Sequence, residues 1–301
     1  MNMNNPKILD EVPFEVIGEG RALLGEGPVW DEKRQRLYWV DILERRIYRY
    51  DPAGNAFERF ELPQYVGALA LRERGGLVLA LQDGFHFYDP DEGRLERVHD
   101  PEPDLPDNRF NDGKCDPAGR FWAGTMSLSG REQAGSLYRL DPDGRVSRML
   151  EKVSISNGLA WSGNGTTMYF IDTPTRCVRA FDYDAEDGSI RNGRVVLRFA
   201  EEEGSPDGMT IDEEGMLWIA FWGGHRVGRW DPRTGRRLKT LALPVPLVTS
   251  CTFGGERMNE LYVTTARAGL SDEELARYPL SGALFRITLD VRGAPAVRFR
   301  G

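Results

Sequence analysis

Short apolar strands separated by glycine- and aspartate-rich turns recur along almost the whole chain. One kind of apolar segment has four residues and begins at Leu37, Leu77, Phe121, Met168, Leu217 and Leu261, so that consecutive copies start 40 to 49 residues apart. Each copy is followed by another strand with a similar pattern, as in Ile47-Tyr-Arg-Tyr-Asp-Pro52 and Leu137-Tyr-Arg-Leu-Asp-Pro142. A multi-strand repeat of about this length is the sequence signature of a β-propeller.

Six copies of the repeat predict an all-β, six-bladed β-propeller that forms a single domain over residues 24–301. A β-sandwich does not explain the regular spacing, and a helical solenoid needs a 3.6-residue period that is absent. Residues 1–23 show no clear period, and we expect them to form a tail that packs on this domain. We expect one helix, at Ser271-Asp-Glu-Glu-Leu-Ala276, because Ser271 and Glu274 have the spacing of a capping box.

Polar residues occupy equivalent positions when the first strand of each repeat is aligned on its glycine. The residues before that glycine are Glu26, Val66, Asp112, Asn157 and Asp207, and Ser250 lies at the same place in the sixth repeat. The first strands of a propeller line its central channel, so these positions should meet around one end of the axis. Asn111, the neighbour of Asp112, joins the same ring.

A ring of carboxylate and amide side chains is difficult to explain by packing alone. Burying like charges costs several kcal/mol unless a cation lies between them. Oxygen ligands without His or Cys suit Ca²⁺, Mg²⁺ or Mn²⁺ better than Zn²⁺. Asn-Gly and Asp-Gly are also common turn dipeptides, and any one of them alone indicates only a turn. Their recurrence in equivalent repeats favours a metal site in the central channel.

Charge and cysteine content restrict the partners and the compartment. The net charge of −8 and the lack of a basic stripe argue against a nucleic-acid partner. The three cysteines are far apart in the sequence and show no zinc-binding spacing, so we expect reduced, buried thiols in a cytoplasmic protein. There is no apolar stretch of the length a membrane helix needs, and no signal-peptide pattern follows Met1. We expect no membrane partner and a monomer.

Four motifs resemble those of the regucalcin/gluconolactonase family of six-bladed propellers. They are Leu24-Gly-Glu-Gly-Pro28, Asn108-Arg-Phe-Asn-Asp-Gly-Lys114, Ser156-Asn-Gly158 and Pro206-Asp-Gly208. Residues 264–271 and 279–285 resemble the bacterial sugar lactonase branch of this family. The similarity runs from about residue 24 to the end of the chain, with the motifs in order. It implies an enzyme that hydrolyses sugar-acid lactones with the help of one divalent metal ion.

The resemblance also implies roles for individual residues. The metal ligands of the family match Glu26, Asn157 and Asp207, and Asp207 is in addition the implied proton acceptor. The substrate-binding residues match Arg109 and Asn111. Some members have a substrate-contacting Glu three residues after the Gly-Thr-Met motif, whereas this chain has Ser129 there. The identity of the sugar therefore stays open.

Sequence alone leaves several functions and metals to compare. The leading hypothesis is a gluconolactonase-type ester hydrolase acting on aldono-1,4- or 1,5-lactones, with Ca²⁺ as the first choice of metal and Zn²⁺, Mg²⁺, Mn²⁺ or Fe²⁺ as alternatives. A non-catalytic, calcium-binding propeller is a second hypothesis, although a scaffold needs no convergent carboxylate–amide ring. A third is a metal-dependent phosphotriesterase or aryl esterase. Arg109 and Asn111 favour a hydroxylated substrate instead.

Overall fold

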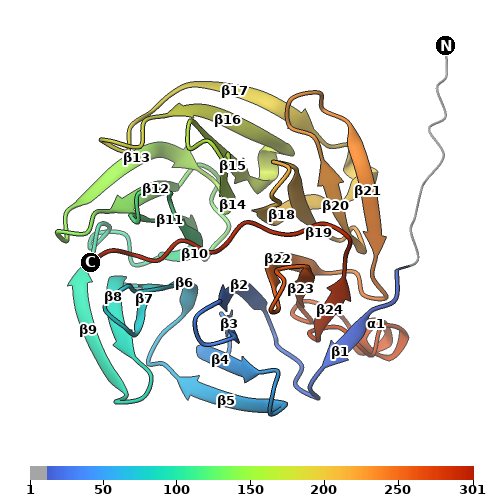
Figure 1. The fold of residues 1–301 in the computed structure, drawn as a ribbon. Coiled ribbons are helices and arrows are strands. Elements are labelled where there is room, and N and C mark those ends of the chain that lie inside the picture. Colours follow the sequence, from blue (N-terminus) through green and yellow to red (C-terminus); the bar gives the residue numbers. More distant parts are fainter. Residues whose placement is uncertain (1–11) are drawn as a thin grey trace.

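Six four-stranded antiparallel sheets surround a central channel in the computed structural model, which describes residues 12–301 (Figure 1). From the inner to the outer strand, blade 1 contains β2 (Gly25–Asp31), β3 (Arg36–Asp41), β4 (Arg46–Asp51) and β5 (Ala56–Glu61), and blade 2 contains β6 (Val66–Leu71), β7 (Leu77–Leu81), β8 (Gly84–Asp89) and β9 (Arg94–His99). Blade 3 contains β10 (Asn108–Cys115), β11 (Phe121–Ser127), β12 (Gly135–Leu140) and β13 (Val146–Val153), and blade 4 contains β14 (Ser156–Trp161), β15 (Thr167–Asp172), β16 (Cys177–Tyr183) and β17 (Ile190–Arg198). Blade 5 contains β18 (Ser205–Ile211), β19 (Leu217–Trp222), β20 (Arg226–Trp230) and β21 (Arg237–Ala242), and blade 6 contains β22 (Val248–Gly254), β23 (Glu260–Thr265), β24 (Leu284–Thr288) and β1 (Glu15–Ile17). The predicted six-bladed, all-β propeller is confirmed.

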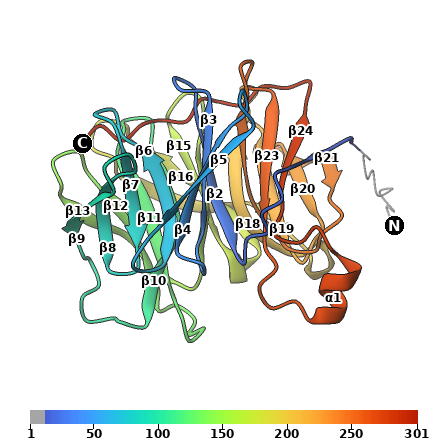
Figure 2. The same cartoon turned by 90° about the horizontal axis from the view of Figure 1, so that it is seen from below.

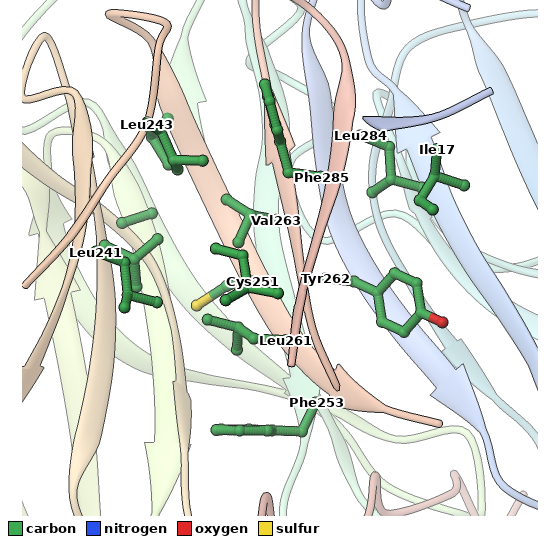
Figure 3. Close-up of a cluster of buried hydrophobic side chains, with 14 of the residues drawn as sticks. Ile17, Leu241, Leu243, Cys251, Phe253, Leu261, Tyr262, Val263, Leu284 and Phe285 are labelled. Carbon is green, nitrogen blue, oxygen red and sulfur yellow. The ribbon is translucent and has the colours of Figure 1, made fainter. Parts of the chain in front are cut away.

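The sixth blade is built from both ends of the described chain. Its outer strand, β1, pairs antiparallel with β24, with Val16 opposite Phe285. Ile17 packs beside Leu284 in an apolar cluster that continues into the inner strands of this blade (Figure 3). Part of the segment expected to pack as a tail is therefore a strand of the propeller. Residues 1–11 of that expected tail lie outside the described residues.

Large aromatic side chains fill the space between blades. Trp122 and Trp218 are fully buried, and their Nε1 atoms donate hydrogen bonds to Asp116 Oδ2 and Asp212 Oδ2, both at 2.9 Å. Because the two Trp–Asp pairs follow the inner strands of blades 3 and 5, they repeat one packing device. The three cysteines are also buried and free, as predicted.

The expected helix forms in the connection between β23 and β24. Helix α1 (Asp272–Arg277) has Ser271 as its N-cap, and the capping box with Glu274 is present in both directions. Figure 2 shows α1 at one end of the propeller and the C-terminus at the other. Among residues 12–301, no helix is long and apolar enough to cross a membrane.

After β24 the chain crosses the end of the channel opposite to α1 (Figure 1). We call residues 289–301 the C-terminal strap. Its main-chain N–H groups at Ala294 and Phe299 donate to Ile211 O at 3.3 Å and to Leu71 O at 2.8 Å. Ile211 and Leu71 are the last residues of the inner strands β18 and β6. The strap therefore lies over the ends of the inner strands, whereas the predicted ring lies near their starts.

Candidate metal and substrate site

All six inner strands have an irregularity at the predicted ring position. The pairing register shifts between Glu26 and Val29, Val66 and Ala68, Phe110 and Gly113, Ser156 and Leu159, Pro206 and Met209, and Val248 and Ser250. A β-bulge of this kind places extra residues against one partner and changes the direction of their side chains. Asn111, Asp112, Asn157 and Asp207 all lie inside these bulges.

Glycines that follow the ring residues let neighbouring inner strands approach closely. A Cβ atom on Gly158 would lie 2.8 Å from Asp207 O, and one on Gly208 would lie 2.2 Å from Ser250 Oγ. Both distances are shorter than real Cβ contacts. The Asn-Gly and Asp-Gly dipeptides are thus needed where one blade meets the next, and they bring the ring residues of adjacent blades together.

Carboxylates, one buried and one half-buried, anchor the main chain where it enters two of the inner strands. Asp41 Oδ1 accepts a hydrogen bond from Leu24 N at 3.1 Å, and Asp172 Oδ1 accepts one from Ile155 N at 2.9 Å. Each anchored N–H group lies two residues before a ring residue, Glu26 in blade 1 and Asn157 in blade 4. These contacts fix the height at which the two side chains enter the channel.

The structure brings three carboxylates together at one end of the channel. Burial, followed by the charges of Asp207 and Asp112, raises the pKa of Glu26 well above its usual value. Burial and the charge of Asp112 likewise raise the pKa of Asp207 well above its usual value, although the side chains of Asn157 and Glu26 act in the opposite direction. A cation among these groups would remove this electrostatic cost.

The chemistry of the predicted ligand set fits a hard divalent cation. Asn157 Oδ1 is buried and accepts no hydrogen bond from residues 12–301, while its Nδ2 donates to Thr173 Oγ1 at 2.9 Å. The free amide oxygen, together with the Glu26 and Asp207 carboxylates, makes an oxygen-only donor set. Within residues 12–301 no three His, Cys, Asp or Glu side chains form a metal-holding cluster, and the predicted set contains two carboxylates and one amide.

Arg109 lies buried beside this ring. Burial lowers the pKa of Arg109 to about 10, while the charges of Glu26 and Asp207 act to raise it, so the guanidinium stays charged at neutral pH. Its Nη1 donates to Phe110 O and to Asn111 Oδ1, both at 2.8 Å. These bonds hold the guanidinium plane in place and leave Nε and Nη2 as available donors.

Asn111 is held by the protein on both sides of its amide. Its Oδ1 accepts from Arg109, and its Nδ2 donates to Ser156 O at 2.9 Å. One N–H and one lone pair remain for a ligand, so Asn111 can still offer both a donor and an acceptor. Ser129, the position where this chain departs from the family pattern, donates from Oγ to Asp107 Oδ2 at 2.5 Å. The four family motifs in the sequence do not include Asp107, so its contact with Ser129 was not predicted.

The structure places Lys114 beside Asp112, which the alignment of the inner strands already assigns to the ring. Asp112 Oδ1 accepts from Gly113 N at 2.7 Å, and burial raises the pKa of Asp112 while Lys114 opposes that shift. Both residues belong to the polar cluster at the start of β10. Asp112 lies inside the bulge of β10, whereas Lys114 follows the bulge and pairs regularly with Trp122.

Comparison with known proteins decides the family. The family model described as "SMP-30/Gluconolactonase/LRE-like region" matches residues 24–267. The chain belongs to this family. It is 41% identical to "Putative sugar lactone lactonase YvrE" of Bacillus subtilis over 93% of this chain and 96% of that protein. It is 44% identical to regucalcin of Gallus gallus over 97% of this chain and all of that protein.

A solved structure of the family has the same overall shape. The calcium-binding protein regucalcin of Agrobacterium tumefaciens superimposes with a TM-score of 0.94 at 32% identity, over 97% of this chain and 99% of that one. SMP-30/gluconolactonase relatives are thus named both for lactone hydrolysis and for calcium binding. The resemblance seen in the four sequence motifs is confirmed.

Proposed function

We propose that this protein is a metal-dependent lactonase that opens aldono-1,4- or 1,5-lactones such as gluconolactone. The observation that carries the proposal is the position of the partner-free Asn157 Oδ1 among the buried carboxylates Glu26 and Asp207, with Arg109 beside them. Relatives named for sugar lactone hydrolysis support the same activity.

Glu26, Asn157 and Asp207 are the residues that would hold one divalent cation. Ca²⁺ is the first candidate, because the donors are all oxygen and a relative of known structure is named as calcium-binding. Mg²⁺, Mn²⁺, Zn²⁺ and Fe²⁺ are the alternatives. When bound, the cation supplies Lewis-acid polarisation of the lactone carbonyl and stabilises the negative charge that develops on its oxygen.

The remaining steps belong to side chains of the ring. Asp207 accepts the proton of the attacking water, the role of a general base. Arg109 offers Nε and Nη2 to the lactone oxygens or to a ring hydroxyl, and its fixed plane orients the substrate. Asn111 adds one donor and one acceptor, which suits a sugar hydroxyl. The proposed partner of the protein is its small lactone substrate. We infer that the protein is a cytoplasmic monomer without nucleic-acid or membrane partners.

A non-catalytic calcium-binding propeller is the second candidate, favoured by the regucalcin relatives. It would use the same Glu26, Asn157 and Asp207 ligands, so metal binding does not distinguish the two functions. Lactone turnover distinguishes them, because only the lactonase hydrolyses the substrate. A phosphotriesterase or aryl esterase would also need the cation but has no use for the hydrogen-bonding pair formed by Arg109 and Asn111.

The test is hydrolysis by the purified protein with an added divalent metal, followed by pH-stat. The substrates are glucono-, xylono-, arabinono- and galactonolactone, with phenyl acetate and a phosphotriester as comparisons. We expect an aldonolactone to be hydrolysed faster than the comparison esters. Asp207→Ala should lose this activity, whereas Asp290→Ala, at an exposed position, is the control and should keep it. Near-normal lactone turnover by Asp207→Ala would refute the proposed site. Turnover confined to the comparison esters would refute the substrate class.

A further inference from the structure

We propose that the strap end of the channel contains a second binding site, at Lys114, for a small organic anion with an apolar body. A cavity of about 230 Å³ lies there, between the inner strands and the C-terminal strap. The cavity is distinct from the candidate metal site, because the proposed metal ligands Glu26, Asn157 and Asp207 are not among the residues that line it. Nothing in the proposed lactonase function uses it.

The walls of this cavity are mostly apolar. They are formed by Pro28, Val29, Leu69, Ala70, Gly113, Lys114, Cys115, Pro117, Ala160, Trp161, Ser162, Gly163, Thr210, Ile211, Thr252 and the strap residues Ala294, Pro295, Ala296 and Val297. All six inner strands contribute. A dry protein cavity of about 150 Å³ accommodates benzene. The present volume is therefore large enough for an aromatic ring or a short aliphatic chain that carries one charged group.

Lys114 is the one charged side chain in the cavity wall. Its Nζ donates to Met209 O at 2.6 Å, its one hydrogen bond within residues 12–301. Asp112 acts on it through charge and not through a hydrogen bond, and burial lowers the pKa of Lys114. An ammonium group has three N–H donors, so two of those of Lys114 have no acceptor among the described residues.

These features select the chemistry of the ligand. A carboxylate can take the free N–H donors of Lys114 in charge-assisted hydrogen bonds, which are stronger than neutral ones. The apolar body of the same ligand would contact side chains such as Leu69 and Ile211. A polyhydroxylated sugar acid is a poor match, because the only side-chain hydroxyls in the wall are those of Ser162, Thr210 and Thr252. The site therefore favours a monocarboxylate of about the size of benzoate.

The strap provides the outer wall and the route of entry. Ala294 N donates to Ile211 O at the long distance of 3.3 Å, and the next main-chain donor of the strap to the inner strands is Phe299 N. Ala294, Pro295 and Val297 line the cavity and are also exposed to solvent. The cavity therefore meets solvent along this short stretch, which is where a ligand would enter.

The test is a ¹⁹F NMR titration of the chelator-treated full chain with 4-fluorobenzoate. Saturable binding to the wild type is expected, with a weaker interaction for the uncharged 4-fluorobenzyl alcohol. Lys114→Met should weaken binding by about tenfold or more, the usual effect of removing a charged hydrogen-bond partner. Arg109→Met removes the buried cation beside the candidate metal site and is the matched control. It should leave the affinity unchanged.

A second variant tests the cavity without touching the lysine. Ala296→Phe in the strap should fill part of the volume and weaken 4-fluorobenzoate binding by a similar factor, even if Lys114→Met does not fold. The proposal is overturned if the wild type shows no saturable binding. It is also overturned if Arg109→Met abolishes binding, or if Lys114→Met and Ala296→Phe both bind as the wild type does.

Discussion

Asn157 donates a hydrogen bond from Nδ2 to Thr173 Oγ1 at 2.9 Å, and Thr173 Oγ1 in turn donates to Pro206 O at 2.9 Å. One hydroxyl thus connects Asn157 in blade 4 with the residue before Asp207 in blade 5. The contact fixes the orientation of the Asn157 amide and leaves Oδ1 without a partner in the ring. Thr173, which belongs to the 3₁₀ turn Thr173–Thr175, positions two of the candidate ligands.

Removal of this hydroxyl should weaken divalent-metal binding. In Thr173→Val the amide of Asn157 can rotate, and loss of such a supporting contact typically costs about 10- to 100-fold in metal affinity. Calorimetric titration of the chelated protein with Ca²⁺ measures the change. Thr288→Val, at an exposed position of β24, is the control and should bind as the wild type does. Equal affinity in Thr173→Val would show that the hydroxyl has no positioning role.

Arg109→Met should separate substrate binding from metal binding. The variant loses the Nε and Nη2 donors, so KM for the lactone should rise by about tenfold or more. Ca²⁺ affinity should not fall, because a positive charge has been removed from the neighbourhood of Glu26 and Asp207. Steady-state kinetics and calorimetry on the same sample distinguish the two effects. A loss of Ca²⁺ affinity equal to the rise in KM would place Arg109 in the support of the metal site.

The stability of the metal-free protein should depend on pH in a definite direction. Burial and neighbouring carboxylates raise the pKa of Glu26 and of Asp207 in the folded protein. Both groups titrate near pH 4 in an unfolded chain, so above that pH the folded state keeps protons that the unfolded state releases. The free energy of unfolding should therefore fall as pH rises from about 4 through the raised pKa values that Glu26 and Asp207 have in the folded protein.

Denaturant unfolding across this pH range, with and without Ca²⁺, tests that expectation. Ca²⁺ should restore stability most at the alkaline end, where both carboxylates are ionised. Asn has nearly the same shape as Asp but cannot ionise. In Asp207→Asn the free energy of unfolding should therefore fall less steeply with pH in the absence of metal. The same slope in the wild type and in Asp207→Asn would contradict the assignment of the decline to this ring.

Substitution of a ring glycine should disturb both stability and activity. A Cβ atom on Gly158 would lie 2.8 Å from Asp207 O, a main-chain atom that cannot move without shifting β18. We expect Gly158→Ala to lower the free energy of unfolding by about 1–3 kcal/mol or more and to reduce lactone turnover. Gly163→Ala is the matched control, since nothing lies within 4 Å of its added Cβ. Equal stability of the two variants would contradict the close-approach argument.

The repeat of apolar segments was sufficient to predict six blades, but not the fourth strand of each blade. The second strands, such as β7, are buried at every residue and therefore stand out in the sequence. An outer strand such as β5 is exposed at five of its six residues, so it has no apolar face to produce an alternating pattern. The pairing of β1 with β24 was equally hidden, because it joins residues at opposite ends of the chain.

The alignment on glycine predicted that Glu26, Asn157 and Asp207 meet, although they lie far apart in the sequence. It also assigned Asn111 and Asp112 to the ring, but it could not predict the bulge that contains both, because bulges are set by pairing with the neighbouring strand. The positioning role of Thr173 could not be predicted from the sequence either. Its contacts with Asn157 and Pro206 depend on the approach of two blades, for which a single sequence contains no local signal.

The measurement that tests the central claim most directly is lactone hydrolysis by chelator-treated wild-type protein, followed by pH-stat as single divalent metals are returned. We predict no turnover of the aldonolactones after chelation and a saturable recovery with Ca²⁺ or another hard divalent ion at the Glu26, Asn157 and Asp207 site. Tight metal binding with no turnover of any lactone would contradict the lactonase and support the calcium-binding propeller. Full turnover in the absence of metal would contradict the proposed role of the cation.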